Sequence, residues 1–191
     1  GEVAGLLNPY QDWRDVQLAT ISYGYGLSVT PLQLAGAYAT LGNDGKQYPT
    51  SFFKLDRSEL PRGHQVIDPK IARQVREMLV RAVQEGGTGT RAKVAGYRVA
   101  GKTGTVRKAG NSGYNEDHYI SIFAGMAPAS RPRLAMVVTV DHPDDGEYYG
   151  GIIAAPVFSR VMEGALRLLD VAPDDLETLQ GVKMAMAGGV K

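Results

Sequence analysis

The chain has 191 residues, enough for one ordinary domain with a hydrophobic core. Its 21 Lys and Arg residues nearly balance its 20 Asp and Glu residues, which argues against a protein that binds nucleic acid or a membrane surface through a basic face. The absence of cysteine excludes disulfides, Cys-ligated zinc, iron–sulfur clusters and thiol nucleophiles.

Three segments have the apolar spacing of helices. The first, 31–42, follows Thr30, which forms a capping box with Gln33. The second, 69–85, opens at the pair Asp68-Pro69 and is ended by the glycine pair 86–87. The third, 156–169, carries a stripe of apolar residues at helical spacing. We therefore expect helices before and after the segment that separates the second helix from the third.

The residues between the last two helices predict strands. Segments 97–106, 119–127 and 134–140 are rich in β-branched and aromatic residues, and turn residues at 108–113 and 129–132 separate them. Consecutive strands with short links favour an antiparallel meander. The predicted fold class is therefore α/β of the α+β type, with an antiparallel sheet flanked by helices.

One motif suggests nucleotide binding. Residues 96–103 fit the P-loop pattern G-x-x-x-x-G-K-[ST], and 135–141 resembles the apolar strand whose final Asp would hold magnesium. A P-loop must lead into a helix whose N-terminus faces the phosphates. Here β-branched residues and glycines follow Lys102, so we expect a strand and treat the nucleotide-binding reading as a remote alternative.

As a strand, the same residues suggest a different chemistry. Lys102 and Gly104 would share one face of the strand, and Thr103 and Thr105 the other. Lys-Thr-Gly is the third element of the S-x-x-K, S-x-N, K-T-G set of β-lactamases and penicillin-binding proteins. An ammonium and hydroxyls suit a substrate carboxylate, and a glycine lets substrate backbone lie against the strand. A lone K-T-G is too short to carry this reading, because an exposed edge strand has the same composition.

Other segments extend the similarity. They are S-Y-G-Y-G-L-S-V-T-P-L-Q-L-A at 22–35, G-G-T-G-T at 86–90, A-G-M-A-P-A at 124–129 and Y-Y-G-G at 148–151. In this order and spacing the chain resembles class B penicillin-binding proteins, and is closest to the division-specific D,D-transpeptidase of Gram-negative bacteria. The resemblance implies that 1–176 is the C-terminal part of one transpeptidase domain and that 177–191 is a flexible tail.

The implied reaction is acyl transfer. A serine would attack the penultimate D-Ala carbonyl of a peptidoglycan stem peptide, and an amine of a second stem would take the acyl group. The resemblance gives Lys102 contacts with the S-x-N serine and the substrate carboxylate. It also implies that the hydroxyls of Thr103 and Thr105 bind that carboxylate, and that the backbone N–H of Thr105 forms half of the oxyanion hole. β-Lactam antibiotics would be captured as mimics of the D-Ala-D-Ala terminus.

Aromatic residues are expected beside this strand. By the resemblance, Tyr119, Tyr148 and Tyr149 wall the pocket for the substrate side chain, and Arg107 adds positive charge at its rim. Ordinary packing in the sheet and loop is an equally good interpretation of the three tyrosines. The acidic turn 141–147 is expected to be solvated rather than a metal site, and neither a metal nor a cofactor is predicted.

The nucleophile is not apparent in this sequence. The single S-x-x-K match, Ser51 to Lys54, lies in a strand-like stretch close before K-T-G, whereas the family's serine opens a helix far upstream. No S-x-N triplet occurs. We therefore expect the serine on a preceding segment, so that these residues supply one wall of the site and are inactive alone. A chain deprived of that N-terminal half is expected to be aggregated or molten.

The resemblance also implies partners and a location. The partners are stem peptides, β-lactams, the N-terminal half of the same domain, and cell-division proteins that include a membrane glycan polymerase. The location is the periplasmic face of the inner membrane, with an anchor outside these residues. A non-catalytic β-lactam sensor or scaffold of the same fold remains the main alternative, because it would share K-T-G without turnover.

Overall fold

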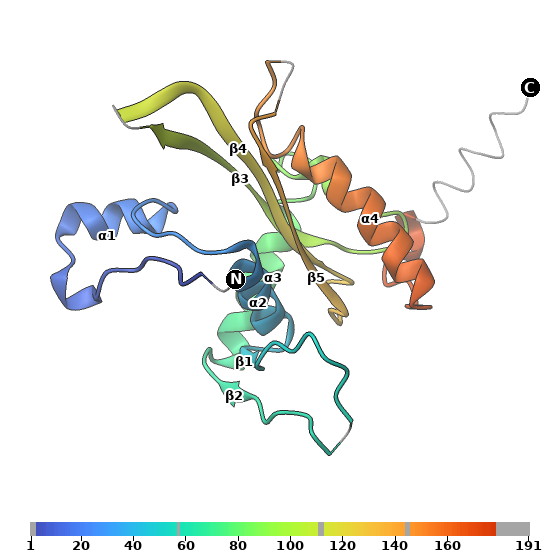
Figure 1. The fold of residues 1–191 in the computed structure, drawn as a ribbon. Coiled ribbons are helices and arrows are strands. Elements are labelled where there is room, and N and C mark those ends of the chain that lie inside the picture. The colour runs from blue at the N-terminus through green and yellow to red at the C-terminus, as the bar shows by residue number, and fades with distance from the viewer. Residues whose placement is uncertain (1–2, 57, 111–112, 144–145, 179–191) are drawn as a thin grey trace, which may run out of the picture.

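The computed structural model of the chain describes residues 3–56, 58–110, 113–143 and 146–178 (Figure 1). Its helices are α1 (Asp15–Ser22), α2 (Pro31–Gly42), α3 (Pro69–Arg81) and α4 (Ala154–Leu168), with short 3-10 turns η1 (Tyr10–Asp12) and η2 (Thr90–Ala92). Its strands are β1 (Lys46–Gln47), β2 (His64–Gln65), β3 (Ala100–Gly110), β4 (Gly113–Ala127) and β5 (Leu134–Asp141).

The main sheet is the antiparallel meander β3-β4-β5. Its register pairs Thr103 with Phe123 and Phe123 with Val138, and it shifts between Arg107 and Ala109 near the far end of the hairpin. The two-residue strands β1 and β2 form a separate small ladder. The predicted order and direction of the three long strands is confirmed.

Helices cover both faces of this sheet (Figure 1). On one face the ring of Phe123 packs against Phe158 of α4, with ring centroids 4.7 Å apart. On the other face Met126 lies in a second cluster with Val80 of α3, and Leu41 of α2 packs against that cluster. Phe123 and Met126 are three positions apart on β4 and so point to opposite faces. The predicted α+β class, an antiparallel sheet flanked by helices, is confirmed.

The start of α2 follows the predicted capping box. The N–H of Gln33 donates to Thr30 Oγ1 at 3.1 Å, and Gln33 Oε1 accepts from the N–H of Thr30 at 2.9 Å. Two of the amide groups that helix geometry leaves without a partner are thereby satisfied. The bounds predicted for this helix, 31–42, are those observed.

The other two predicted helices have different bounds. Helix α3 ends at Arg81 rather than at 85, because the chain turns back and the N–H of Gly89 donates to the carbonyl of Ala82. Helix α4 begins at Ala154 rather than at 156, because the N–H of Ala154 already donates to Gly150. Pro156 is therefore within the first helical turn, where its missing N–H costs nothing.

The strands also differ from their predicted ends. Strand β3 begins at Ala100 rather than 97, since Gly96 takes a positive φ of 82° and Val94 bridges to Tyr97 just before it. At the other end β3 continues to Gly110 and β4 begins at Gly113, so the predicted turn 108–113 is largely strand. Turn-forming composition was overridden there by cross-strand pairing.

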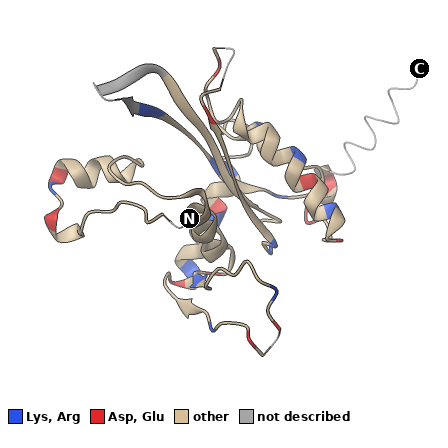
Figure 2. Ribbon diagram, in the orientation of Figure 1, with Lys and Arg blue, Asp and Glu red and all other residues tan. Residues whose placement is uncertain are grey.

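Two segments extend away from the sheet (Figure 1). They are 3–30, which contains α1, and 48–63, between β1 and β2; both expose large apolar side chains, among them Leu6, Leu7 and Phe52. Charged residues of both signs are dispersed over the elements rather than gathered on one face (Figure 2). Within the described residues, no helix is both long and apolar enough to span a membrane.

Candidate active site

The K-T-G-T residues lie on β3, and in the described part of the chain β3 pairs only with β4. Within those residues the other edge of β3 is therefore unpaired. Lys102 bends round it, so that its Nζ donates to the carbonyl of Thr103 at 3.1 Å and to Thr103 Oγ1 at 3.2 Å. Thr103 Oγ1 is in turn 2.9 Å from Thr88 Oγ1. An ammonium and two hydroxyls thus form one hydrogen-bonded row along the edge.

A groove of about 320 Å³ lies on the threonine side of this strand. Thr103 and Thr105 line it together with Tyr149 and the glycines that follow. The N–H of Gly150 donates to Thr105 Oγ1 at 3.1 Å. A Cβ on Gly150 would be 2.5 Å from the carbonyl oxygen of Gly104, so only glycine lets this loop press against β3. The loop after β5 and the K-T-G strand are therefore built as one unit.

The predicted aromatic residues form a stack beside the groove. The ring of Tyr119 is 4.0 Å from that of Tyr148 at an interplanar angle of 10°, and Tyr148 contacts Tyr149 with centroids 4.6 Å apart. Arg107 Nη2 donates to the Tyr119 hydroxyl at 2.9 Å, and the guanidinium is 5.4 Å from the ring centroid. An arginine and three tyrosines from β3, β4 and the loop are thereby brought together.

The stack is anchored by a buried serine and contains a hydrogen bond between two of its tyrosines. Ser121, fully buried on β4, donates its hydroxyl to the carbonyl of Tyr148 and so fixes the loop to the sheet. The hydrogen bond from Tyr148 to the Tyr149 hydroxyl, 3.5 Å long, is the main cause that raises the pKa of Tyr148 above its usual 10.0, while the Arg107 charge opposes it. The Tyr148 phenol therefore stays protonated at neutral pH and can donate a hydrogen bond.

The structure divides the predicted site residues between two adjoining places. Thr103, Thr105 and Tyr149 line the groove, whereas Arg107, Tyr119 and Tyr148 form the stack. The groove also includes Thr88, Thr90 and Arg91, to which sequence reasoning gave no role. The signal for them was the G-T-G-T loop at 87–90, which resembled the family but carried no assigned chemistry.

Ser51 is not placed as a nucleophile. Its Oγ accepts from the N–H of Phe53 at 3.1 Å and donates to the carbonyl of that residue at 2.9 Å, a local turn. The stretch around it is an irregular loop, so the strand predicted there is wrong. That loop extends away from β3 (Figure 1). The expectation that Ser51 and Lys54 match S-x-x-K by coincidence stays a prediction.

The P-loop alternative fails on local structure. The residues after Lys102 continue β3 to Gly110, where a P-loop requires the start of a helix. The segment 135–141 is β5, which lies two strands from β3 in the sheet. Nucleotide binding by 96–103 is therefore excluded by the fold.

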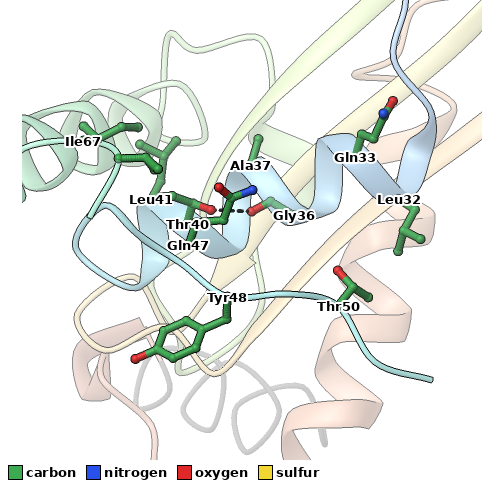
Figure 3. Close-up of a pocket in the computed structure, with 11 residues that line it drawn as sticks. Leu32, Gln33, Gly36, Ala37, Thr40, Leu41, Gln47, Tyr48, Thr50 and Ile67 are labelled. Atoms are coloured by element: carbon green, nitrogen blue, oxygen red, sulfur yellow. Dashed lines mark hydrogen bonds between the residues drawn. The ribbon is translucent and has the colours of Figure 1, made fainter. Parts of the chain in front are cut away.

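A second hollow, about 620 Å³, lies along α2 and away from this chemistry. Figure 3 shows it between α2 and the chain that follows β1. Thr40, on its wall, donates its hydroxyl to the carbonyl of Gly36 at 2.9 Å. Its lining contains no carboxylate, ammonium, guanidinium or imidazole, so it offers no general acid or base of ordinary strength.

The sequence of this chain matches a known protein family. Residues 1–163 match the model of the penicillin binding protein transpeptidase domain. Because the match covers most of the chain, the chain belongs to this family. It is 47% identical over 178 residues to the peptidoglycan D,D-transpeptidase FtsI of Escherichia coli K12, and 44% over 173 residues to the probable peptidoglycan D,D-transpeptidase PenA of Neisseria flavescens. These alignments cover 93% and 91% of this chain, and 30% and 43% of the relatives.

Solved structures agree with this assignment. The apo transpeptidase domain of penicillin-binding protein 3 from Burkholderia pseudomallei matches with a TM-score of 0.84 and 44% identity. A structure described as a peptidoglycan glycosyltransferase from Burkholderia ambifaria matches with a TM-score of 0.79 and 42% identity. Each match covers 90% of this chain, and the chain spans about half of each structure, 52% and 51%.

Proposed function

We propose that the complete protein is a serine-type D,D-transpeptidase that cross-links peptidoglycan stem peptides and is acylated by β-lactams. The observation that carries this proposal is the K-T-G-T strand: Thr103 and Thr105 line a groove, and the Lys102 ammonium donates to the Thr103 hydroxyl. In this proposal the nucleophilic serine and the S-x-N motif come from a part of the domain outside these residues. The present chain alone is then inactive.

The groove can hold a carboxylate with neutral hydroxyls and a nearby cation. Thr105 Oγ1 accepts the N–H of Gly150, which leaves its own proton to donate outward. Lys102 polarises Thr103 by donating to its hydroxyl oxygen. A substrate carboxylate placed between the two threonines would therefore receive hydrogen bonds strengthened by charge.

Gly104, the glycine of the motif, favours the proposal that substrate binds along β3. A Cβ on Gly104 would meet nothing closer than Ile122 at 3.5 Å, an ordinary contact. Packing within the described residues thus does not require glycine there. Space for substrate backbone laid along β3 does require it, as in the addition of a strand to a sheet.

The proposed reaction has two steps. The serine Oγ attacks the penultimate D-Ala carbonyl, the peptide C–N bond breaks, and D-Ala leaves with the proton as its free amine. The amine of a second stem then attacks the ester, and the serine regains its proton as it departs. The backbone N–H of Thr105 would hold the oxyanion in both steps. Tyr119, Tyr148 and Tyr149 would wall the pocket for the substrate side chain, with Arg107 at its rim.

A septal role is the finer part of the proposal. It rests on the resemblance to division-specific transpeptidases, and it implies a site of action at the periplasmic face of the inner membrane. The implied partners are cell-division proteins, including a membrane glycan polymerase. Depletion of the protein in its host should then block septation while elongation continues, and a normal septum would contradict this part.

The activity itself is tested on the complete protein with two readouts. Fluorescent penicillin should label it covalently, and mass spectrometry should map the adduct to a serine outside these residues. Stem pentapeptides with an amine acceptor should then give cross-linked product with release of D-Ala. Labelling without turnover would favour the sensor or scaffold alternative, and no labelling would contradict the proposal.

A further inference from the structure

The groove beside K-T-G contains a cation that the motif does not supply. Its lining is made of hydroxyl-bearing, glycine and apolar residues together with one guanidinium: Thr88, Thr90, Arg91, Thr103, Thr105, Tyr149, Gly150, Gly151 and Ile152. No acidic side chain is among them. A groove with hydroxyl donors, a fixed positive charge and no carboxylate of its own is suited to an anion.

Arg91 is available to such a ligand. Several other arginines of the described residues are in ion pairs: Arg73 and Arg76 with Asp44, and Arg98 with Glu77. Within that same part of the chain Arg91 has neither an ion pair nor a side-chain hydrogen bond. An exposed guanidinium keeps its five N–H groups free for a ligand.

The backbone that carries Arg91 is held firmly against the K-T-G strand and the core. Its neighbour Ala92 is fully buried, and the carbonyl of Lys93 accepts the Ser159 hydroxyl from α4. Three residues earlier, Thr88 Oγ1 contacts Thr103 Oγ1 at 2.9 Å. The backbone is thus held by contacts on both sides of Arg91 in the sequence. This reduces the entropy cost of placing its guanidinium in the groove.

We propose that Arg91 is a specificity-determining residue that binds the carboxylate of the acyl donor, or of a β-lactam, together with Thr103 and Thr105. This inference rests on the proposed function. Lys102 can act on the same carboxylate as a point charge, but its ammonium is already engaged with Thr103 at the strand edge. A guanidinium adds a planar, bidentate pair of donors that neither the hydroxyls nor an ammonium provides.

The test uses the complete transpeptidase with two probes. A fluorescent penicillin carries the carboxylate, whereas an acylaminomethyl boronic acid binds a catalytic serine reversibly and has none. Arg91→Gln should lower the second-order rate of penicillin labelling at least about tenfold, the scale of one hydrogen bond to a charged group. It should leave the inhibition constant of the boronic acid within twofold. Arg91→Lys should recover part of the loss.

The control is Arg131→Gln, which removes an exposed arginine from the β4–β5 link and should leave both probes unchanged. Labelling of Arg91→Gln within twofold of wild type would overturn the inference, as would equal losses for both probes. Labelling of wild type, with its adduct on a serine, keeps the proposed function intact in either case. Failure of wild type to be labelled would instead contradict the proposed function.

Discussion

Lys102 is the residue on which the proposed chemistry depends most directly. Lys102→Ala in the complete protein removes the ammonium that donates to Thr103 and that, in the proposed function, contacts the substrate carboxylate. We expect the rate of acylation by fluorescent penicillin to fall about 10²-fold or more, as for loss of one electrostatic stabiliser. Lys70→Ala, on the exposed side of α3, is the matched control and should label normally. Labelling of Lys102→Ala at the wild-type rate would remove Lys102 from the site.

For Ser51 we predict the opposite result, that its substitution has no effect on labelling. Its hydroxyl donates to the carbonyl of Phe53 in a loop away from β3, and within the described residues no side-chain base accepts its proton. Ser51→Ala should leave penicillin labelling of the complete protein unchanged within error. An adduct mapped to the peptide that contains Ser51 would contradict this and would make the chain self-sufficient in its nucleophile.

At the scale of elements, the loop after β5 depends on glycine to reach β3. Gly150→Ala would place a Cβ 2.5 Å from the Gly104 carbonyl and so push the loop, with Tyr148 and Tyr149, away from the sheet. We expect a loss of about 1–3 kcal/mol in the free energy of unfolding and slower penicillin labelling. Thermal denaturation and labelling of the complete protein measure the two effects.

A second glycine serves as its control. Gly164 is exposed on α4, and an added Cβ would meet nothing within 4 Å. Gly164→Ala should therefore stabilise the helix by about 0.5–1 kcal/mol and leave labelling unchanged. A destabilised Gly164→Ala, or a Gly150→Ala as stable as wild type, would contradict the role of the close approach between the loop and β3.

The packing of α2 on the sheet should make the free energy of unfolding depend on pH in the alkaline range. Burial raises the pKa of Tyr38 from 10.0 to about 12. The neutral phenol is therefore favoured in the folded state, so its contribution is complete below pH 10 and is lost as pH rises toward 12. The complete protein should lose on the order of 1–2 kcal/mol of stability over that interval through this group. Tyr38→Phe should reduce the dependence, and an unchanged slope of stability against pH would contradict the assignment.

At the scale of the whole molecule, the described residues leave much apolar surface uncovered. Phe52 and Phe53 are each 84% exposed, and α1 has no buried residue. Large contiguous apolar patches are rare on soluble proteins. At about 25 cal/mol per Å², several hundred Å² left in water would cost on the order of 10 kcal/mol, comparable with the stability of a domain.

We therefore predict that residues 1–191 expressed alone are aggregated or molten. The folded chain should exist only with the rest of its domain, attached or clipped and still associated. The measurements are size-exclusion chromatography, thermal denaturation and amide NMR of the isolated chain. A soluble monomer with a cooperative transition and dispersed amide resonances would contradict this prediction.

Local signals in the sequence determined a large part of this fold. The capping box at Thr30 placed the start of α2 correctly, and alternation of β-branched residues placed the middle of all three long strands. K-T-G-T indicated the candidate site, because the residue types that the proposed chemistry needs follow one another within one strand. Each of these signals is contained within a few consecutive residues, which is why the sequence alone was sufficient.

Features that depend on contacts between segments distant in sequence were decided only by the tertiary structure. Arg91 and Thr103 line one groove because the loop before η2 contacts β3 through Thr88, and Ser121 anchors Tyr148 across 27 positions of sequence. The ends of α3 and α4 were set by hydrogen bonds to Ala82 and Gly150 rather than by their own glycines or proline. Such contacts leave no periodic pattern, because backbone polar groups and side chains take whichever partners the packed fold brings within reach.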